Sequence, residues 1–122
     1  VCAKSETRVL FIAYEHVIKR CENACKFHSQ LVSNLLQMIA LRASQQANRI
    51  YVLSRNSIRK KIMTYLNSIA AEKQTKTVIL PMSYTTLAEY LSVDRSAMMR
   101  ELKNLADEGI IERDGKKLRI LD

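Results

Sequence analysis

The pattern of apolar positions changes early in the chain. Residues 7–12 read TRVLFI, a β-branched and apolar run that predicts one strand. After this run, Val17, Ile18, Cys21 and Cys25 recur at helical spacing, which predicts a short amphipathic helix. The opening resembles the end of a β-rich segment, and the chain does not start with Met. We therefore expect it to be a piece of a longer protein.

A longer helix is predicted over residues 29–53, where small and apolar residues recur every three or four positions. A helix of about 25 residues spans almost 40 Å at roughly 1.5 Å per residue, too long for so short a chain to cover. Alanines in the stripe would let a second backbone approach, so we expect a two-stranded coiled coil between identical chains. A helix packed within its own chain is the alternative. The expected homodimer interface consists of Val32, Leu36, Ala40, Ala43, Ala47 and Ile50.

A further helix follows the long one. Ser54 or Asn56 is placed to cap it, because either side-chain oxygen can accept a hydrogen bond from a free backbone N–H. The helix ends in the polar residues 72–76, and residues 77–80 predict a short strand. The predicted helix carries an apolar face of Ile58, Ile62, Leu66 and Ile69 opposite the basic Arg59, Lys60 and Lys61.

Two helices joined by a very short turn come next. Ser83 is placed to cap the first, over residues 84–91, and Asp94 to cap the second, over residues 95–107. This arrangement predicts a helix-turn-helix, in which the small Ala88 would let the two helices cross closely.

Alternating residues on both sides of Asp114-Gly115 predict a β-hairpin, with strands over residues 110–113 and 116–121. Asp-Gly favours a type I′ turn, which needs two positive φ angles. The predicted fold class is mainly α with a small antiparallel β-sheet: a long dimerisation helix followed by a winged helix-turn-helix domain. We place the domain boundary between residues 1–53 and 54–122.

Charge and the second helix of the pair favour a nucleic-acid partner. The formal net charge is +8, without a polybasic block. Opposite the predicted core of that helix lie Arg95, Ser96, Met99, Arg100 and Lys103. Arginine reads guanine O6 and N7 in the major groove, and lysine neutralises phosphate. A solvated charged face is the alternative.

The cysteines do not indicate a disulfide framework, since there are only three. They indicate free thiols and a cytoplasmic protein. Cys21, Cys25 and His28 share one helix face, a set that could bind zinc or an iron–sulfur cluster as a metal or redox sensor. Three ligands leave the fourth position unspecified, and cysteine often serves as a small buried hydrophobe. We therefore expect no metal site and no cofactor in this chain.

Other classes of function find little support. Two glycines in all leave no phosphate-cradling loop, and no orienting carboxylate is evident beside either histidine, so we expect no enzyme. No apolar run approaches the roughly 18 residues of a membrane span, so we expect no membrane partner.

Residues 83–95, SYTTLAEYLSVDR, are similar to the helix-turn-helix of the cyclic AMP receptor protein/fumarate-nitrate regulator (Crp/Fnr) family of bacterial transcription factors. Residues 99–103 and 108–111 match the family too, and the likeness extends over the whole chain as the C-terminal part of such a protein. It implies an upstream effector-binding β-roll, whose last strand would be residues 7–12. The effector of that missing domain is unknown. The resemblance also implies transcription regulation by a homodimer on a near-palindromic operator in double-stranded DNA.

The resemblance also implies roles for single residues. Many members carry Glu where this chain has Ser96. Without that glutamate the chain lacks an acceptor for cytosine N4–H, so no known operator sequence is carried over to it. Ser44 falls near an effector-reading position, and the polar loop at residues 71–77 near a surface that contacts RNA polymerase. A winged-helix dimer for protein–protein interaction is the alternative function. Base edges would be read by Arg95, Ser96, Met99 and Arg100, and phosphates contacted by Thr85, Lys103, Lys116 and Lys117.

Overall fold

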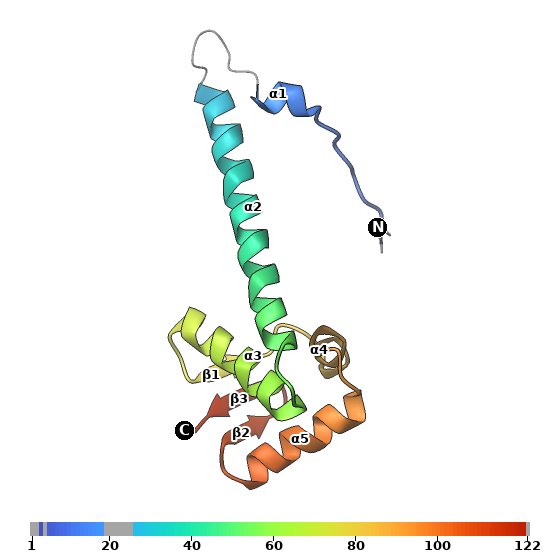
Figure 1. The fold of residues 1–122 in the computed structure, drawn as a ribbon, viewed down its shortest axis with the longest axis vertical. Helices are drawn as coiled ribbons and strands as arrows, with labels where there is room; N and C mark the ends of the chain where they lie inside the picture. The colour runs from blue at the N-terminus through green and yellow to red at the C-terminus, as the bar shows by residue number, and fades with distance from the viewer. Residues whose placement is uncertain (1–2, 4, 19–25, 122) are drawn as a thin grey trace. The chain divides into compact units, whose positions relative to one another are not determined.

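The computed structural model describes residues 3, 5–18 and 26–121 (Figure 1). The chain forms two compact units, residues 1–43 and residues 44–122. Cys21 and Cys25 lie outside the described residues, so the metal or redox alternative keeps only His28 within them. No helix of the described chain is both long and apolar enough to cross a membrane.

The strand predicted over residues 7–12 is not formed, and this prediction is wrong for the chain as it stands. The segment has irregular backbone, and Phe11 is 92% exposed. A strand needs a neighbouring strand to complete its ladder of hydrogen bonds, and the described part of residues 1–43 contains none. Of the short helix predicted next, the described part is α1 (Tyr14–Ile18), whereas its predicted positions Cys21 and Cys25 lie outside the described residues.

The long helix is confirmed as α2 (Lys26–Leu53), which begins three residues before the predicted start and ends where predicted. Its last turns belong to the second compact unit. The Asn48 side-chain amide donates to the Ser68 hydroxyl (3.3 Å), and the Arg49 guanidinium lies 5.2 Å from the centre of the Tyr90 ring. The compact units therefore divide at residue 44, whereas the predicted domain boundary at residue 54 stays a prediction.

The helix after α2 is α3 (Ile58–Lys73), and its cap is Ser57, so neither Ser54 nor Asn56 serves as predicted. The Ser57 hydroxyl accepts a hydrogen bond from the backbone N–H of Lys60 (3.2 Å). The Ser54 hydroxyl instead donates to a carbonyl in the last turn of α2 (2.8 Å).

The helix-turn-helix has the predicted boundaries. It consists of α4 (Tyr84–Leu91) and α5 (Arg95–Asp107). The Ser83 hydroxyl accepts from a backbone N–H in the first turn of α4 (3.1 Å), and the Asp94 carboxylate does the same in α5 (2.9 Å). Ser92, in the turn, has φ +51 and ends α4 in the left-handed conformation.

A three-stranded antiparallel sheet in the order β1-β3-β2 completes the winged helix. Its strands are β1 (Thr77–Ile79), β2 (Ile111–Asp114) and β3 (Lys117–Ile120). The observed elements, mainly helices with this small sheet, confirm the predicted fold class.

The β2–β3 hairpin is here called the wing, and the turn that joins its two strands is called its tip. This turn differs from the predicted one. Asp114 pairs with Lys117, so the two loop residues are Gly115 and Lys116 rather than Asp114 and Gly115. Gly115 has φ +54, whereas neither Asp114 nor Lys116 has a positive φ. A positive φ at the first loop residue alone is the pattern of a type II′ turn, so the predicted type I′ turn is wrong.

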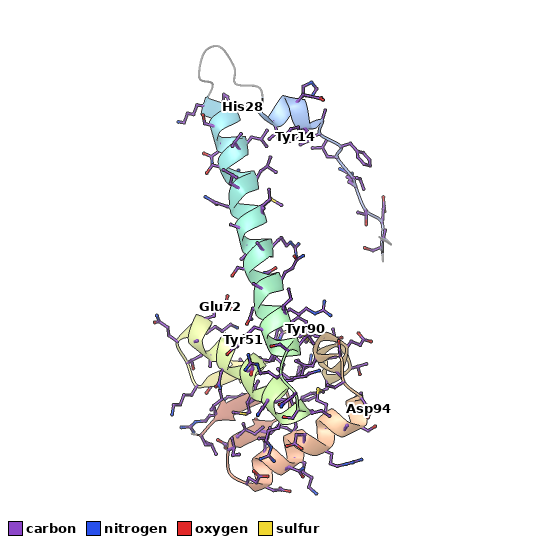
Figure 2. The ribbon with its side chains drawn as sticks, in the orientation of Figure 1. Tyr14, His28, Tyr51, Glu72, Tyr90 and Asp94 are labelled. Atoms are coloured by element: carbon purple, nitrogen blue, oxygen red, sulfur yellow. The ribbon has the colours of Figure 1, made fainter. Side chains whose placement is uncertain are left out.

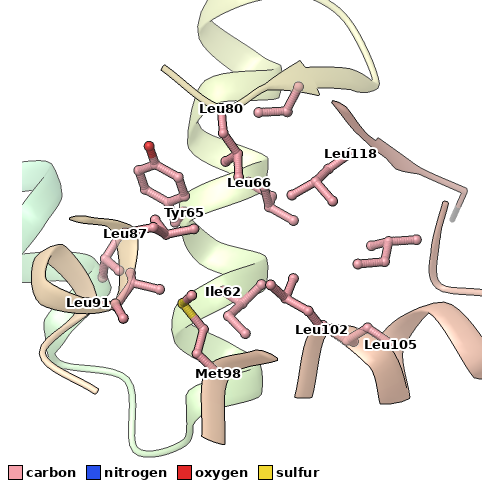
Figure 3. Close-up of a cluster of buried hydrophobic side chains, with 14 of the residues drawn as sticks. Ile62, Tyr65, Leu66, Leu80, Leu87, Leu91, Met98, Leu102, Leu105 and Leu118 are labelled. Atoms are coloured by element: carbon pink, nitrogen blue, oxygen red, sulfur yellow. The ribbon is translucent and has the colours of Figure 1, made fainter. Parts of the chain in front are cut away.

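One hydrophobic core holds the second unit together (Figure 3). Ala88 is only 3% exposed, as expected where α4 and α5 cross closely. Val52 brings the end of α2 into the same core. The largest fully buried side chains come from α2, α3, α4, α5 and the sheet, and are Ile62, Leu66, Leu87, Leu91, Met98, Leu102, Leu105, Ile111, Leu118, Val52 and Val78.

Candidate nucleic-acid interface

α5 presents one apolar face to the core and one polar face outward. Its 13 residues begin directly after Asp94, which lies at the N-terminal end of the helix (Figure 2). Met98, Leu102 and Leu105 are fully buried at helical spacing. The opposite face points away from the core, and it carries the exposed Arg95, Ser96, Arg100 and Lys103.

Met99 differs from the other residues predicted to read bases. It is half-buried and packs against the core, at the edge of the exposed face of α5. An open groove of about 540 Å³ lies between α5 and β2, and Met99 lines it together with Lys103 and Arg113. The structure thus brings Lys103 to the same groove as Arg113 on β2.

An ion-pair cluster ties α5 to α3. The Arg59 guanidinium donates to Glu101 and also makes two hydrogen bonds of 2.6 and 2.7 Å to the Glu108 carboxylate. These contacts lower the pKa of the Glu108 carboxyl and raise that of Arg59. Arg59 is thus engaged in holding α5 and does not lie free on a solvated basic face. The sequence pattern gave no sign of this, because the partners are more than 40 residues apart.

The predicted phosphate contacts on α4 and on the wing lie at one end of the unit. The Tyr84 hydroxyl donates a hydrogen bond to the carbonyl of Gly115, so the first residue of α4 touches the tip of the wing. Thr85 and Lys116, the next residue on each side, are both exposed. Lys117 follows on β3 and is exposed as well.

Two residues at this end were missed by sequence reasoning, Tyr84 and Arg113. The Arg113 guanidinium lies 5.7 Å from the centre of the Tyr84 ring. Burial raises the pKa of Tyr84, and the nearby Arg113 charge partly opposes the shift. No local pattern could have found the contact, since Tyr84 and Gly115 are 31 residues apart.

The predicted dimer stripe is largely uncovered in the single chain. Leu36 is 62% exposed and Ile50 68% exposed, while Val32 is half-buried. The three alanines of the stripe, and Ser44, are exposed too. His28 is half-buried, and no cluster of three His, Cys, Asp or Glu side chains able to hold a metal occurs within residues 3, 5–18 and 26–121.

Comparison with known proteins agrees with this geometry. Residues 60–122 match the Crp-like helix-turn-helix domain family. Over 70 residues the chain is 40% identical to "Probable transcriptional regulator flp" of Lacticaseibacillus casei, covering 57% of this chain and 32% of that relative. The chain thus spans about a third of the length of this curated relative.

A solved structure has the same fold. It is described as a "putative transcriptional regulator of the crp/fnr family" from Eubacterium rectale, with a TM-score of 0.52 and 24% identity, covering 75% of this chain and 42% of that one. The matched family is a helix-turn-helix domain and the curated relative is a probable transcriptional regulator, which agrees with the expectation of a DNA-binding regulator. The chain belongs to the Crp-like helix-turn-helix domain family.

Proposed function

We propose that the chain binds a near-palindromic operator as a homodimer, with α5 of each copy in the major groove. The observation that carries this proposal is the outward face of α5, where Arg95, Ser96 and Arg100 are exposed opposite a fully buried face. An α-helix fits the major groove, and arginine can donate two hydrogen bonds to guanine O6 and N7. Met99, at the edge of this face, would make apolar contact with a thymine methyl group.

The phosphate contacts are supported by position and charge. Lys103 flanks the base-reading face, and Thr85, Lys116 and Lys117 lie exposed where α4 meets the wing. Each lysine that neutralises a phosphate releases a counterion, which gives affinity without sequence preference. These contacts would fix the register in which α5 meets the bases.

The homodimer is supported by the uncovered stripe on α2. Apolar and small side chains at steps of three and four residues remain exposed over most of the stripe, from Leu36 to Ile50. Pairing two such helices would bury the stripe and place two winged helices for a two-fold operator. The residues proposed for this interface are Val32, Leu36, Ala40, Ala43, Ala47 and Ile50.

The proposal is tested by selecting duplexes from a random pool with the purified chain at about 150 mM salt, near physiological ionic strength. We expect an inverted repeat with half-sites about one helical turn apart. Binding that ignores sequence and vanishes at this salt would contradict the proposal. It would favour the winged helix as a protein-interaction module.

A further inference from the structure

The tip of the wing is held from two sides. The Tyr84 hydroxyl, on α4, donates to the carbonyl of Gly115. The backbone N–H of Leu80, just after β1, donates to the carbonyl of Lys116 (3.0 Å). Both loop residues of the turn are thus bonded to other parts of the fold. Both hydrogen bonds are accepted by backbone carbonyls, so the backbone of the turn is held in place while the Lys116 side chain stays exposed to solvent.

The Tyr84 ring also contacts the strand that leads into the tip. The Arg113 guanidinium lies 5.7 Å from the ring centre, within the range of a cation–π contact. Arg113 lines the groove between α5 and β2 that Lys103 also lines. Tyr84 is half-buried, and burial raises the pKa of its hydroxyl, which stays protonated and able to donate at neutral pH.

We propose that Tyr84 is a positioning residue for DNA binding, which holds the wing so that Lys116 and Lys117 meet the phosphate backbone. The inference rests on the proposed function. Tyr84 acts through the wing: its hydroxyl is engaged with Gly115 and the lysines make the contacts. A surface ordered before binding loses less conformational freedom on binding, so fixing the wing strengthens binding without adding a contact to DNA.

The test is the affinity of Tyr84→Phe for the selected operator, because this change removes the hydroxyl and keeps the ring beside Arg113. We expect binding about three- to tenfold weaker, the range of one net hydrogen bond. The loss should be equal for operator and unrelated duplexes, with base preference unchanged. Tyr90→Phe is the matched control on the same helix, and should bind like the wild type.

A second background separates positioning from general stability. In a chain carrying Lys116→Ala and Lys117→Ala, Tyr84→Phe should cost less than about twofold, since the lysines through which it acts are gone. Both substitutions keep the backbone carbonyls of the wing. The thermal midpoint of each variant is measured alongside.

Two results would overturn the inference. One is an unchanged affinity of Tyr84→Phe while the wild type binds its operator selectively. The other is the same loss in both backgrounds together with a lower thermal midpoint, which would show a merely structural role. A wild-type chain without sequence-selective binding would instead overturn the proposed function itself, and this inference with it.

Discussion

The two compact units differ in how their apolar side chains are covered. In residues 44–122, Leu66 and Leu102 are fully buried, and no buried side-chain polar atom among the described residues lacks a hydrogen-bond partner. In residues 1–43, Phe11, Phe27 and Leu36 are 92%, 85% and 62% exposed. The winged helix of the second unit thus buries its core within itself, whereas Ile50, in the α2 segment of the same unit, is 68% exposed like the stripe before it. Exposed apolar residues in the first are the feature expected of a surface buried by assembly.

Removing residues 1–43 should separate the two units and have the largest effect on DNA binding. The fragment 44–122 should still fold, since the core lies from Val52 onward. Its operator affinity should fall about 10²-fold or more, because a monomer loses the effective concentration of its second half-site. Thermal unfolding measures whether the fragment folds, and fluorescence anisotropy measures its affinity for the operator. A fragment that does not unfold cooperatively would show that the second unit does not fold alone. A fragment that binds as tightly as the whole chain would show that residues 1–43 do not contribute to operator binding.

Two leucine substitutions, one in each unit, should differ in their effect on stability. Leu66→Ala should lower the free energy of unfolding by about 2–5 kcal/mol, as expected for a cavity in a packed core. Leu36→Ala should change it by about 0.5 kcal/mol or less in dilute monomer, because that side chain is mostly exposed. Denaturant titration at two protein concentrations measures both. At a protein concentration at which the chain dimerises, Leu36→Ala should lower the stability of the dimer. An equal loss of unfolding free energy in the two variants at every concentration would contradict the difference between the two units.

Lys116→Ala tests a smaller effect confined to the wing. It should weaken binding to all duplexes about equally and reduce the slope of log affinity against log salt by about 1. Lys73→Ala, at the exposed end of α3, is the matched control and should leave the slope unchanged. Salt titrations of affinity for operator and unrelated duplex measure this. A loss confined to the operator would mean that Lys116 reads bases.

The pH dependence of the Arg59–Glu108 contact should be the smallest effect. Arg59 lowers the pKa of the Glu108 carboxyl below its ordinary value of 4.5. The stabilisation is therefore complete above pH 4.5 and is lost as the pH falls through the lower pKa of the folded state. Glu108→Gln should lower the thermal midpoint slightly at pH 7 and progressively less below pH 4.5. A difference independent of pH would mean that the ion pair does not stabilise the fold.

Sequence reasoning was accurate where the determinants are local. The boundaries of α4 and α5 were predicted to the residue, because Ser83 and Asp94 accept hydrogen bonds from the turn that directly follows each of them. The apolar spacing along α5 likewise gave its buried side. Its exposed side was predicted by the same periodicity, except that Met99 is half-buried.

Predictions failed where several neighbouring residues could serve equally well, or where the structure depends on a partner that is distant in the sequence. Ser57, rather than Ser54 or Asn56, caps α3, and three nearby polar residues look alike in sequence. A strand over residues 7–12 cannot form without a partner strand. The contact between Tyr84 and Gly115 joins elements that only the tertiary fold brings together.

Base reading by α5 is tested by combining Arg100→Ala with base-pair substitutions in one selected half-site. If α5 reads the major groove, Arg100→Ala should cost about 1–3 kcal/mol of binding free energy and abolish the preference at one base pair, leaving the others intact. Replacing that base pair should then weaken wild-type binding and leave Arg100→Ala unaffected. Wild-type preference at every base pair in Arg100→Ala would show that this face of α5 does not read the operator.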